Sequence, residues 1–285
     1  MKIAILGASG QLGHALRSVL PDAVALSRHD ADLTRPTGIH DVLSALRPTA
    51  VVNAAAYTHV DRAETEPAAA VAVNAQGVSD LAKICRDLNA VLVHISTNYV
   101  FGEDSQRCIP YRETDAPGPL GVYGTTKLAG ENFVRELCPR HFILRTCGLY
   151  GRSGTRTNFV EAMLRQAARG GVVRVVNDQI CTPTSAFDLA GAIHQMLGSE
   201  AYGLYHVTNA NACSWLEFAE WVFKLARKSP RLIPISSAEY VAAARRPFYS
   251  VLDNSKWKAA GFALLRPWQD ALADYLNAAR PAPEA

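Results

Sequence analysis

The 285-residue chain lacks most of the features that mark specialised classes of protein. It has no apolar run long enough to span a bilayer, and glycine follows the apolar residues 3–6 at once. We therefore expect neither a membrane anchor nor a signal peptide. An excess of charge of one sign is also missing. The formal net charge of +3 gives no electrostatic reason to expect a nucleic-acid or membrane partner.

The six cysteines are scattered along the sequence and form no Cys-x-x-Cys pair. This spacing argues against a zinc site, and we predict no metal centre. Free thiols fit a reducing compartment, so the sequence favours a cytoplasmic protein over a secreted, disulfide-linked one. The composition, with 49% hydrophobic and 19% charged residues, is that of a globular protein with one large domain or two modest ones.

Apolar runs alternate with segments of helical periodicity along the first half of the chain. Runs typical of buried strands cover residues 2–6, 24–26, 50–55, 91–95 and 142–145, and helical spacing covers residues 11–20, 39–46, 68–88 and 123–137. Strands that alternate with helices predict a parallel sheet with helices on both faces. Right-handed crossovers then give a doubly wound, Rossmann-like α/β fold.

The pattern changes near residue 155. Beyond it we expect helices over residues 159–169, 188–196 and 215–226, and short strands over residues 172–176 and 202–207. The chain is thus divided into a dinucleotide-binding domain, residues 1–155, and a smaller C-terminal α/β domain, residues 156–285, that mainly binds substrate. A segment near residues 178–200 is expected to pack back on the first domain.

A glycine motif, Gly7-x-x-Gly10-x-x-Gly13, stands where the first strand turns into the first helix. Gly7 suits the tight turn, and Gly10 lets the backbone approach a pyrophosphate that rests on the helix N-terminus. Gly13 permits close packing of the helix. A glycine turn without a ligand is the alternative, but the flanking strand and helix favour a dinucleotide site.

The residues after the second strand bear on the choice of cofactor. An acidic residue directly at the strand end would hold the ribose 2′-hydroxyl of NAD, whereas Ser27-Arg28 can pair with a 2′-phosphate. We therefore expect NADPH, with NADH as the alternative in which Arg28 is a solvated loop charge. Asp32 and Leu33 can face the adenine, and the alanines at 54–56 leave room for the dinucleotide.

Tyr123 and Lys127 are four residues apart on a predicted helix, which puts both on one face. A tyrosine hydroxyl titrates near ~10, and a nearby ammonium lowers its pKa. Tyr123 can then exchange a proton with a substrate oxygen while hydride moves at the neighbouring carbon, and Lys127 can hold the nicotinamide ribose. Thr97, or else Ser96, can bind the substrate carbonyl from the end of the fourth strand. A surface pair and a strand cap are the alternatives.

Together these features resemble the extended short-chain dehydrogenase/reductase superfamily and, more closely, the dTDP-4-dehydrorhamnose reductase family. The matching segments run in order through nearly the whole chain: GASGQLG (7–13), VNAAAYTHVDRAE (52–64), STNYVF (96–101), YGTTKLAGE (123–131), RTCGLYG (145–151), NDQ (177–179) with TPT (182–184), and RRP (245–247) with Ser250.

The resemblance implies an NAD(P)H-dependent reduction of a nucleotide-linked 4-keto sugar, the step from dTDP-4-dehydro-L-rhamnose to dTDP-L-rhamnose. By motif, Tyr123 donates the proton, Lys127 supports it and Thr97 holds the sugar oxygen. With the residues above, the expected cofactor contacts are Gly7, Ser9, Gly10, Gln11, Leu12, Ser27, Arg28, Asp32, Leu33, Ala55, Ala56, Tyr57, Thr58, Ser96, Tyr123 and Lys127.

The expected substrate contacts are Thr97, Asn98, Gly148, Arg245 and Arg246. The two arginines suit a diphosphate, although a solvated basic turn is the alternative. Asn98 stands where the family usually has aspartate, and Gly148 where its Arg-Thr-x-Trp motif has tryptophan. An amide carries no charge, and a lost indole removes stacking often worth ~1 kcal/mol beyond burial.

These two departures leave the exact sugar open, so a reductase or epimerase of another nucleotide sugar is a second hypothesis. A third is a non-catalytic dinucleotide-binding regulatory subunit, because the β subunit of methionine adenosyltransferase resembles the same reductases. The sequence also leaves open whether the chain forms a homodimer.

Overall fold

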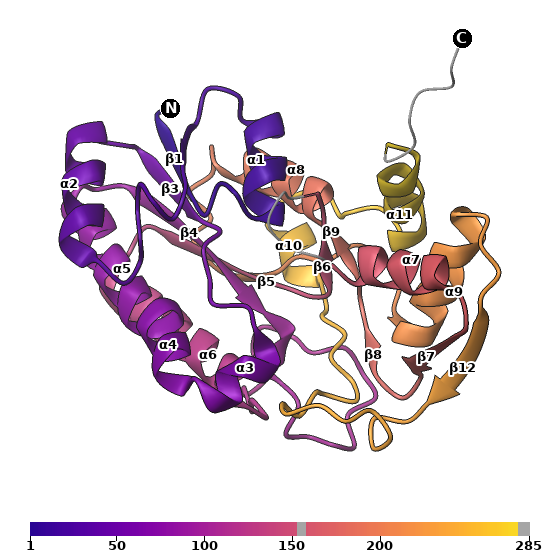
Figure 1. Ribbon diagram of the computed structural model, residues 1–285. Helices are drawn as coiled ribbons and strands as arrows, with labels where there is room; N and C mark the ends of the chain where they lie inside the picture. Colours follow the sequence, from indigo (N-terminus) through magenta and orange to yellow (C-terminus); the bar gives the residue numbers. More distant parts are fainter. Residues whose placement is uncertain (153–157, 279–285) are drawn as a thin grey trace, which may run out of the picture.

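A six-stranded parallel sheet forms the centre of the computed structural model, which describes residues 1–152 and 158–278 (Figure 1). Its strands are β1 (Ile3–Leu6), β2 (Val24–Leu26), β3 (Ala50–Asn53), β4 (Val91–Thr97), β5 (His141–Thr146) and β10 (Gly203–His206). They lie in the order β10-β5-β4-β3-β1-β2, and each neighbouring pair is parallel. Nearly continuous apolar runs form these strands because both faces of the sheet are buried.

Helices cover both faces of this sheet (Figure 1). On one face α1 (Gln11–Val19) packs with α8 (Ala186–Met196), a helix from the second half of the chain. The other face carries α2 (Pro36–Leu46), α5 (Gly77–Asp87) and α6 (Val122–Leu137). The predicted doubly wound, Rossmann-like sheet is confirmed.

The strand order reverses between β1 and β3, and this reversal positions the site. In open α/β sheets, ligands bind beyond the carboxyl ends of the strands at such a point. The turn after β1 and the segment after β3 meet there. A Cβ built on Gly7, which has a left-handed φ of +76°, would lie 2.7 Å from the backbone nitrogen of Ala55.

The long helix expected over residues 68–88 consists of three joined pieces. A π-helical turn (Ala72–Gln76) lies between α4 (Pro67–Val71) and α5. Asn74 in this turn is fully buried, and its amide accepts from the backbone nitrogen of Tyr57 at 2.9 Å and donates to its carbonyl at 3.0 Å. The extra residue of the turn thus aims an amide at the chain that follows β3.

A second hydrophobic core lies to one side of the central sheet. It is formed by α7 (Phe159–Arg169), α9 (Trp215–Leu225) and α11 (Trp268–Asn277) around the parallel pair β7 (Val172–Val176) and β12 (Arg231–Ile235). The remaining elements are α3 (Val60–Thr65), a 3₁₀ turn (Asn98–Val100), β6 (Leu149–Tyr150) paired with β9 (Thr184–Ser185), β8 (Ile180–Cys181) paired with β11 (Cys213–Ser214), and α10 (Ser255–Ala259).

The placement of one predicted strand is wrong. The sequence assigns residues 202–207 to the smaller domain, whereas β10 pairs with β5 and extends the central sheet. An apolar run is buried in either place, so its pattern cannot decide between them. The predicted boundary at residue 155 lies outside the described residues, and the division into two domains stays a prediction.

Replacing Gly13 by alanine is expected to destabilise the fold by about 1–3 kcal/mol, as overpacking does. The new Cβ would lie 2.2 Å from the carbonyl oxygen of Gly7 and 2.6 Å from the Cα of Ala8. Gly38→Ala in α2 is the matched control, because beyond its chain neighbours and the backbone of its own helix nothing lies within 4 Å of its Cβ, and alanine favours a helix by roughly 0.5–1 kcal/mol. Urea unfolding measures both; an unchanged midpoint for Gly13→Ala would contradict the close contact.

Candidate active site

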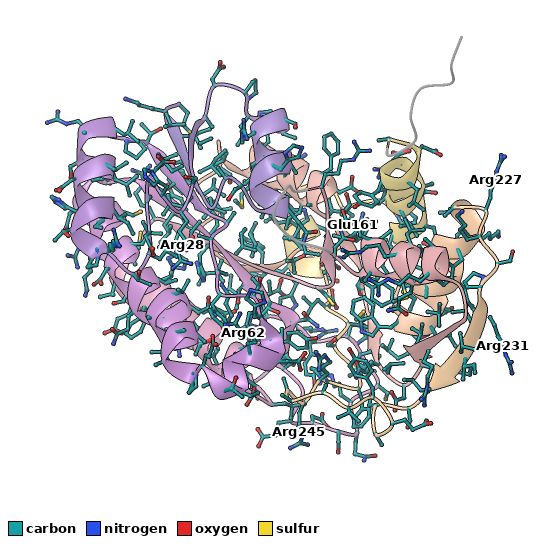
Figure 2. The ribbon with its side chains drawn as sticks, viewed as in Figure 1. Arg28, Arg62, Glu161, Arg227, Arg231 and Arg245 are labelled. Atoms are coloured by element: carbon teal, nitrogen blue, oxygen red, sulfur yellow. The ribbon has the colours of Figure 1, made fainter. Side chains whose placement is uncertain are left out.

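The predicted site residues gather at the carboxyl edge of the central sheet. The turn after β1 carries Gly7, Ser9, Gly10, Gln11 and Leu12; the chain after β2 carries Ser27, Arg28, Asp32 and Leu33; the chain after β3 carries Ala55, Ala56, Tyr57 and Thr58; the end of β4 carries Ser96, Thr97 and Asn98; and α6 carries Tyr123 and Lys127. Arg28 and Arg245 lie far apart in Figure 2, at the two ends of this region.

The N-terminus of α1 is suited to an anion. Its N-cap is Gly10, which offers no side-chain cap, and the first turn holds no acidic residue. The helix N–H groups and the positive end of the dipole are therefore left to a ligand. Beside them the buried Oε1 of Gln11 has no hydrogen-bond partner among the described residues. An orphaned buried acceptor at this turn fits a bound group that donates to it.

Arg28 extends into solvent beyond β2, with 79% of its side chain exposed. Its Nε donates to Asp32 at 3.1 Å, and Thr34 donates its N–H and hydroxyl to the other carboxylate oxygen. Burial opposes ionisation, but the hydrogen bonds from Thr34 and Arg28 hold the pKa of Asp32 below its ordinary value. The hydroxyl of Ser27 is bound to Asp30 at 2.6 Å.

Lys127 is buried on α6, with 2% of the residue exposed. Its Nζ donates to the carbonyl oxygen of Ile95 at 2.6 Å and lies 3.3 Å from Nε2 of His94. Burial lowers the pKa of Lys127 to about 8, against the opposing pull of Glu131 one turn further along the helix. A lysine with this pKa can exist in either charge state near neutral pH.

A buried ion pair joins α6 to β5. Arg145 on β5 donates to both oxygens of Glu131, at 2.9 Å from Nε and 2.7 Å from Nη2. Ser96, expected as a cofactor contact, donates its hydroxyl to the same carboxylate at 2.5 Å. The structure thus gives the Ser96 side chain a partner within the protein.

Thr97 and Asn98 form a hydrogen-bonded turn at the end of β4. The hydroxyl oxygen of Thr97 accepts from the backbone nitrogen of Tyr99 at 3.1 Å, and its proton points to the Asn98 side chain at 3.3 Å. Asn98, expected against the substrate, donates to the hydroxyl of Ser250 at 2.8 Å. Its amide therefore joins the first half of the chain to a distant segment.

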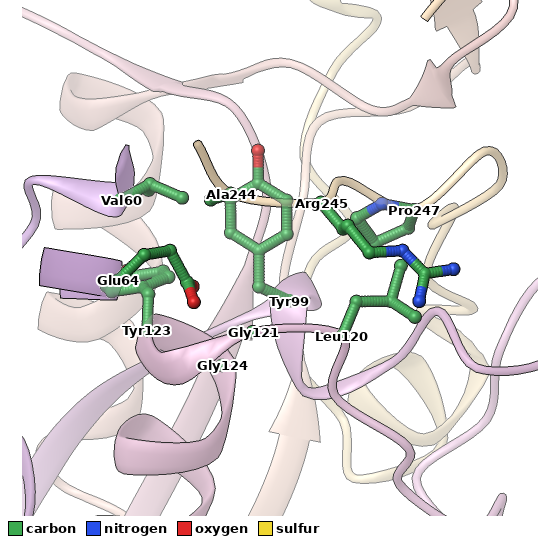
Figure 3. A pocket seen from close by; sticks show the side chains of 10 residues that line it. All are labelled: Val60, Glu64, Tyr99, Leu120, Gly121, Tyr123, Gly124, Ala244, Arg245 and Pro247. Atoms are coloured by element: carbon green, nitrogen blue, oxygen red, sulfur yellow. The ribbon is translucent and has the colours of Figure 1, made fainter. Parts of the chain in front are cut away.

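A pocket lies against Tyr123 (Figure 3). It is lined by Val60, Glu64, Tyr99, Leu120, Gly121, Tyr123, Gly124, Ala244, Arg245 and Pro247. Figure 3 shows Glu64 and Tyr123 on one side of Tyr99 and Arg245 on the other. The rings of Tyr99 and Tyr123 meet edge to face, 5.7 Å apart. Of the two predicted arginines, Arg245 lines this pocket.

Arg246 has a different partner. Its guanidinium makes a two-pronged ion pair with Asp61 of α3, at 3.2 and 2.8 Å, and the backbone nitrogen of Ala244 donates to the same carboxylate. The hydrogen bond from Arg246, then the one from Ala244, hold the pKa of Asp61 below its ordinary value even though burial opposes this. Residues 244–246 are thereby fastened to α3 beside the pocket.

Three residues of the site lie in the matching segments 52–64, 96–101 and 123–131, but the sequence analysis gave them no role. Glu64 accepts from the backbone nitrogen of Val122 at 2.9 Å and so caps α6 just before Tyr123. Burial raises the pKa of Tyr99, so this phenol stays neutral. The sequence could have pointed to Glu131, because this residue lies eight positions after Tyr123 and so on the same face of the helix.

Within residues 1–152 and 158–278, no group of three or more His, Cys, Asp or Glu side chains is placed to hold a metal ion. In the same part of the chain, no helix combines the length and apolar character needed to cross a membrane.

Comparison with known proteins gives one consistent family. A family described as "RmlD substrate binding domain" matches residues 1–280. The dTDP-4-dehydrorhamnose reductase of Streptomyces griseus is 42% identical over 98% of this chain and 96% of its own length. A dTDP-4-keto-6-deoxy-D-glucose reductase of Streptomyces niveus is 39% identical, with 94% of each chain covered.

The crystal structure of a Bacillus anthracis dTDP-4-dehydrorhamnose reductase in complex with NADP superposes with a TM-score of 0.93 and 38% identity, over 98% of this chain and all of that one. Fold and sequence agree over nearly the full length. The chain belongs to the dTDP-4-dehydrorhamnose reductase family, within the extended short-chain dehydrogenases/reductases.

Proposed function

We propose that this chain reduces the keto group of a dTDP-linked 4-keto sugar, with dTDP-4-dehydro-L-rhamnose as the first candidate substrate and dTDP-L-rhamnose as the product. Family membership makes it an NAD(P)H-dependent oxidoreductase. The observation that carries the proposal is α6, which holds Tyr123 and the buried Lys127 on one face at the carboxyl edge of the sheet.

The residues present fit NADPH. The uncapped N-terminus of α1 suits the pyrophosphate, the orphaned Oε1 of Gln11 suits a hydrogen-bond donor of the same ligand such as a ribose hydroxyl, and the exposed guanidinium of Arg28 suits a 2′-phosphate. The Bacillus anthracis relative was solved with NADP, which supports the same preference here. When bound, NADPH supplies the hydride that reaches the keto carbon.

The protein supplies the proton. Tyr123 donates its hydroxyl proton to the oxygen that hydride transfer leaves negatively charged. Lys127 favours the resulting phenolate while it is protonated and can return a proton to it. Thr97 can turn its hydroxyl from Asn98, a contact of 3.3 Å, to the substrate oxygen. Arg245 lines the pocket and can receive the diphosphate.

A different 4-keto sugar is the second candidate. Gly148 has a left-handed φ of +53°, and a Cβ there would lie 3.2 Å from Pro183 and 3.3 Å from the Trp215 ring. A side chain at this position would strain the backbone and crowd Pro183 and Trp215, so this conformation disfavours the tryptophan that the family usually carries. The Streptomyces niveus relative, named for another dTDP-linked sugar, supports keeping this candidate.

The decisive assay follows loss of NADPH absorbance with dTDP-4-dehydro-L-rhamnose supplied by coupled upstream enzymes. Rapid turnover supports the first candidate, and the best rate in a panel of keto sugars identifies the substrate. NADPH binding without turnover on any sugar would instead favour a regulatory subunit, and co-purification with a partner enzyme would test that role.

Tyr123→Phe is expected to lower kcat by about 10²–10⁴-fold, because only the proton donor is lost. The dissociation constant for NADPH, measured by fluorescence titration, should stay within about twofold. Tyr205→Phe is the matched control, since Tyr205 lies on β10 in the hydrophobic core and its hydroxyl donates to the carbonyl oxygen of Ala201 at 2.8 Å. A Tyr123→Phe enzyme with most of its activity would rule out this tyrosine as the donor.

Arg28→Ala is expected to raise the KM for NADPH by about 10–100-fold, because a hydrogen bond to a charged group is lost. The KM for NADH should stay unchanged, because NADH has no 2′-phosphate. Arg86→Ala serves as control, because Arg86 is likewise exposed and pairs with Asp87 at the far end of α5. Initial rates with both cofactors measure the effect. An equal change for NADPH and NADH would show that Arg28 does not read the 2′-phosphate.

A further inference from the structure

Lys127 is in contact with a histidine that the proposed chemistry does not use. His94 lies on β4 with none of its surface exposed, and its Nε2 is 3.3 Å from the Lys127 Nζ. Its other ring nitrogen, Nδ1, is 3.2 Å from the Nδ2 of Asn53, the last residue of β3. Asn53 is equally buried, with 1% exposed. Lys127, His94 and Asn53 thus form a buried chain of polar contacts near the carboxyl edge of the sheet.

The far end of this line fixes the orientation of the Asn53 amide. The backbone N–H of Ala55 donates to Oδ1 of Asn53 at 3.2 Å, and only the oxygen of the amide can accept it. The NH₂ group of Asn53 therefore faces His94 and donates. The Nδ1 of His94 must then be the acceptor and carries no proton.

A neutral imidazole with an unprotonated Nδ1 carries its proton on Nε2. We propose that Asn53 and His94 are positioning residues for the proposed reaction: Asn53 holds the imidazole in the Nε2–H form, and this N–H faces the Lys127 nitrogen and stabilises its neutral amine. The amine accepts from Nε2–H with its lone pair and donates to the Ile95 carbonyl. An ammonium has no lone pair for that contact.

The other groups near Lys127 act on it in known directions. Glu131 on the same helix favours the ammonium, but Arg145 from β5 neutralises that carboxylate through the two-pronged pair. Tyr123 lies one turn before on α6. Burial, and then the charge of Lys127, hold the pKa of His94 well below its ordinary value, so the ring stays neutral across the working range.

This arrangement makes Lys127 a better acid toward Tyr123. After the sugar oxygen takes the tyrosine proton, the ammonium gives one of its protons to the phenolate and becomes an amine. The His94 N–H stabilises that amine, and solvent later restores the proton. Below about pH 8, where the pKa of Lys127 is placed, the ammonium is present; above it the proton is lost and reduction should slow.

The tautomer of His94 can be determined by NMR, without an assay of activity. In protein labelled with ¹⁵N in its histidine rings, long-range ¹H–¹⁵N spectra distinguish a protonated ring nitrogen from an unprotonated one. The signal missing from His94→Leu is that of His94. It is expected to show Nε2 protonated and Nδ1 bare, unchanged from pH 6 to 9. An Nδ1–H form or an imidazolium would overturn the proposal, whatever sugar the enzyme reduces.

A double-mutant cycle tests the link to Lys127. Asn53→Asp accepts from both Ala55 and His94, so it forces the Nδ1–H form and turns a bare Nε2 toward the lysine. The alkaline limb of the pH profile of kcat/KM should then move up by roughly one pH unit. In the His94→Leu background the same substitution should move it by less than half as much.

Equal shifts in both backgrounds would mean that the new carboxylate acts by charge alone, and would overturn the coupling through the ring. His141→Leu is the matched control, because His141 on β5 is half-buried and bonds only to the Cys138 carbonyl among the contacts described for its ring. Its pH profile should match the wild type. If Asn53→Asp does not fold, the spectra of the unmodified protein still decide the tautomer.

Discussion

The ion pair between Glu131 and Arg145 is the constraint on which the geometry of the site depends. Both side chains are almost wholly excluded from solvent, at 0% and 1% exposure. A buried charge without its partner costs several kcal/mol, so only an arrangement that keeps both hydrogen bonds is tolerated. The pair fixes the rotation of α6 against β5. Lys127 and Tyr123, one and two turns earlier on the same face, then point to the carboxyl end of β4.

Close contacts fix the same helix along its length. A Cβ on Gly124 would lie 2.1 Å from the Tyr99 carbonyl, and one on Gly130 would lie 2.3 Å from the carbonyl of Asn74. The helix thus touches backbone on either side of the site, while Glu64 caps its first turn. Side chains of ordinary size at those two glycines would push α6 away from the sheet and shift Tyr123 relative to the pocket that it lines.

The sequence was sufficient to predict those parts of the fold and the candidate site that depend on local patterns. Apolar runs and helical spacing placed the strands and helices of the first half, and the glycine motif and the Tyr-x-x-x-Lys spacing placed the turn after β1 and the reactive face of α6. It was not sufficient for contacts between distant segments. Asn98 bonds to Ser250, 152 residues away, and Arg246 to Asp61, 185 residues away. No periodicity reveals such partners, so the sequence predicts a substrate contact for each side chain and not its partner within the protein.

In the proposed site, the contact between Arg246 and Asp61 separates sugar selectivity from the chemistry. The groups proposed for proton transfer belong to β4 and α6, whose positions are fixed by the buried ion pair and by glycine contacts. The far wall of the pocket belongs to residues 244–247, which Asp61 holds in place through Arg246 and the Ala244 backbone. A change in that segment would alter the shape that the proposed site offers to a sugar, while Lys127 and the sheet lie outside the segment. In the proposed site, selectivity can therefore vary while the chemistry stays constant, which agrees with relatives that are named for different dTDP-linked sugars.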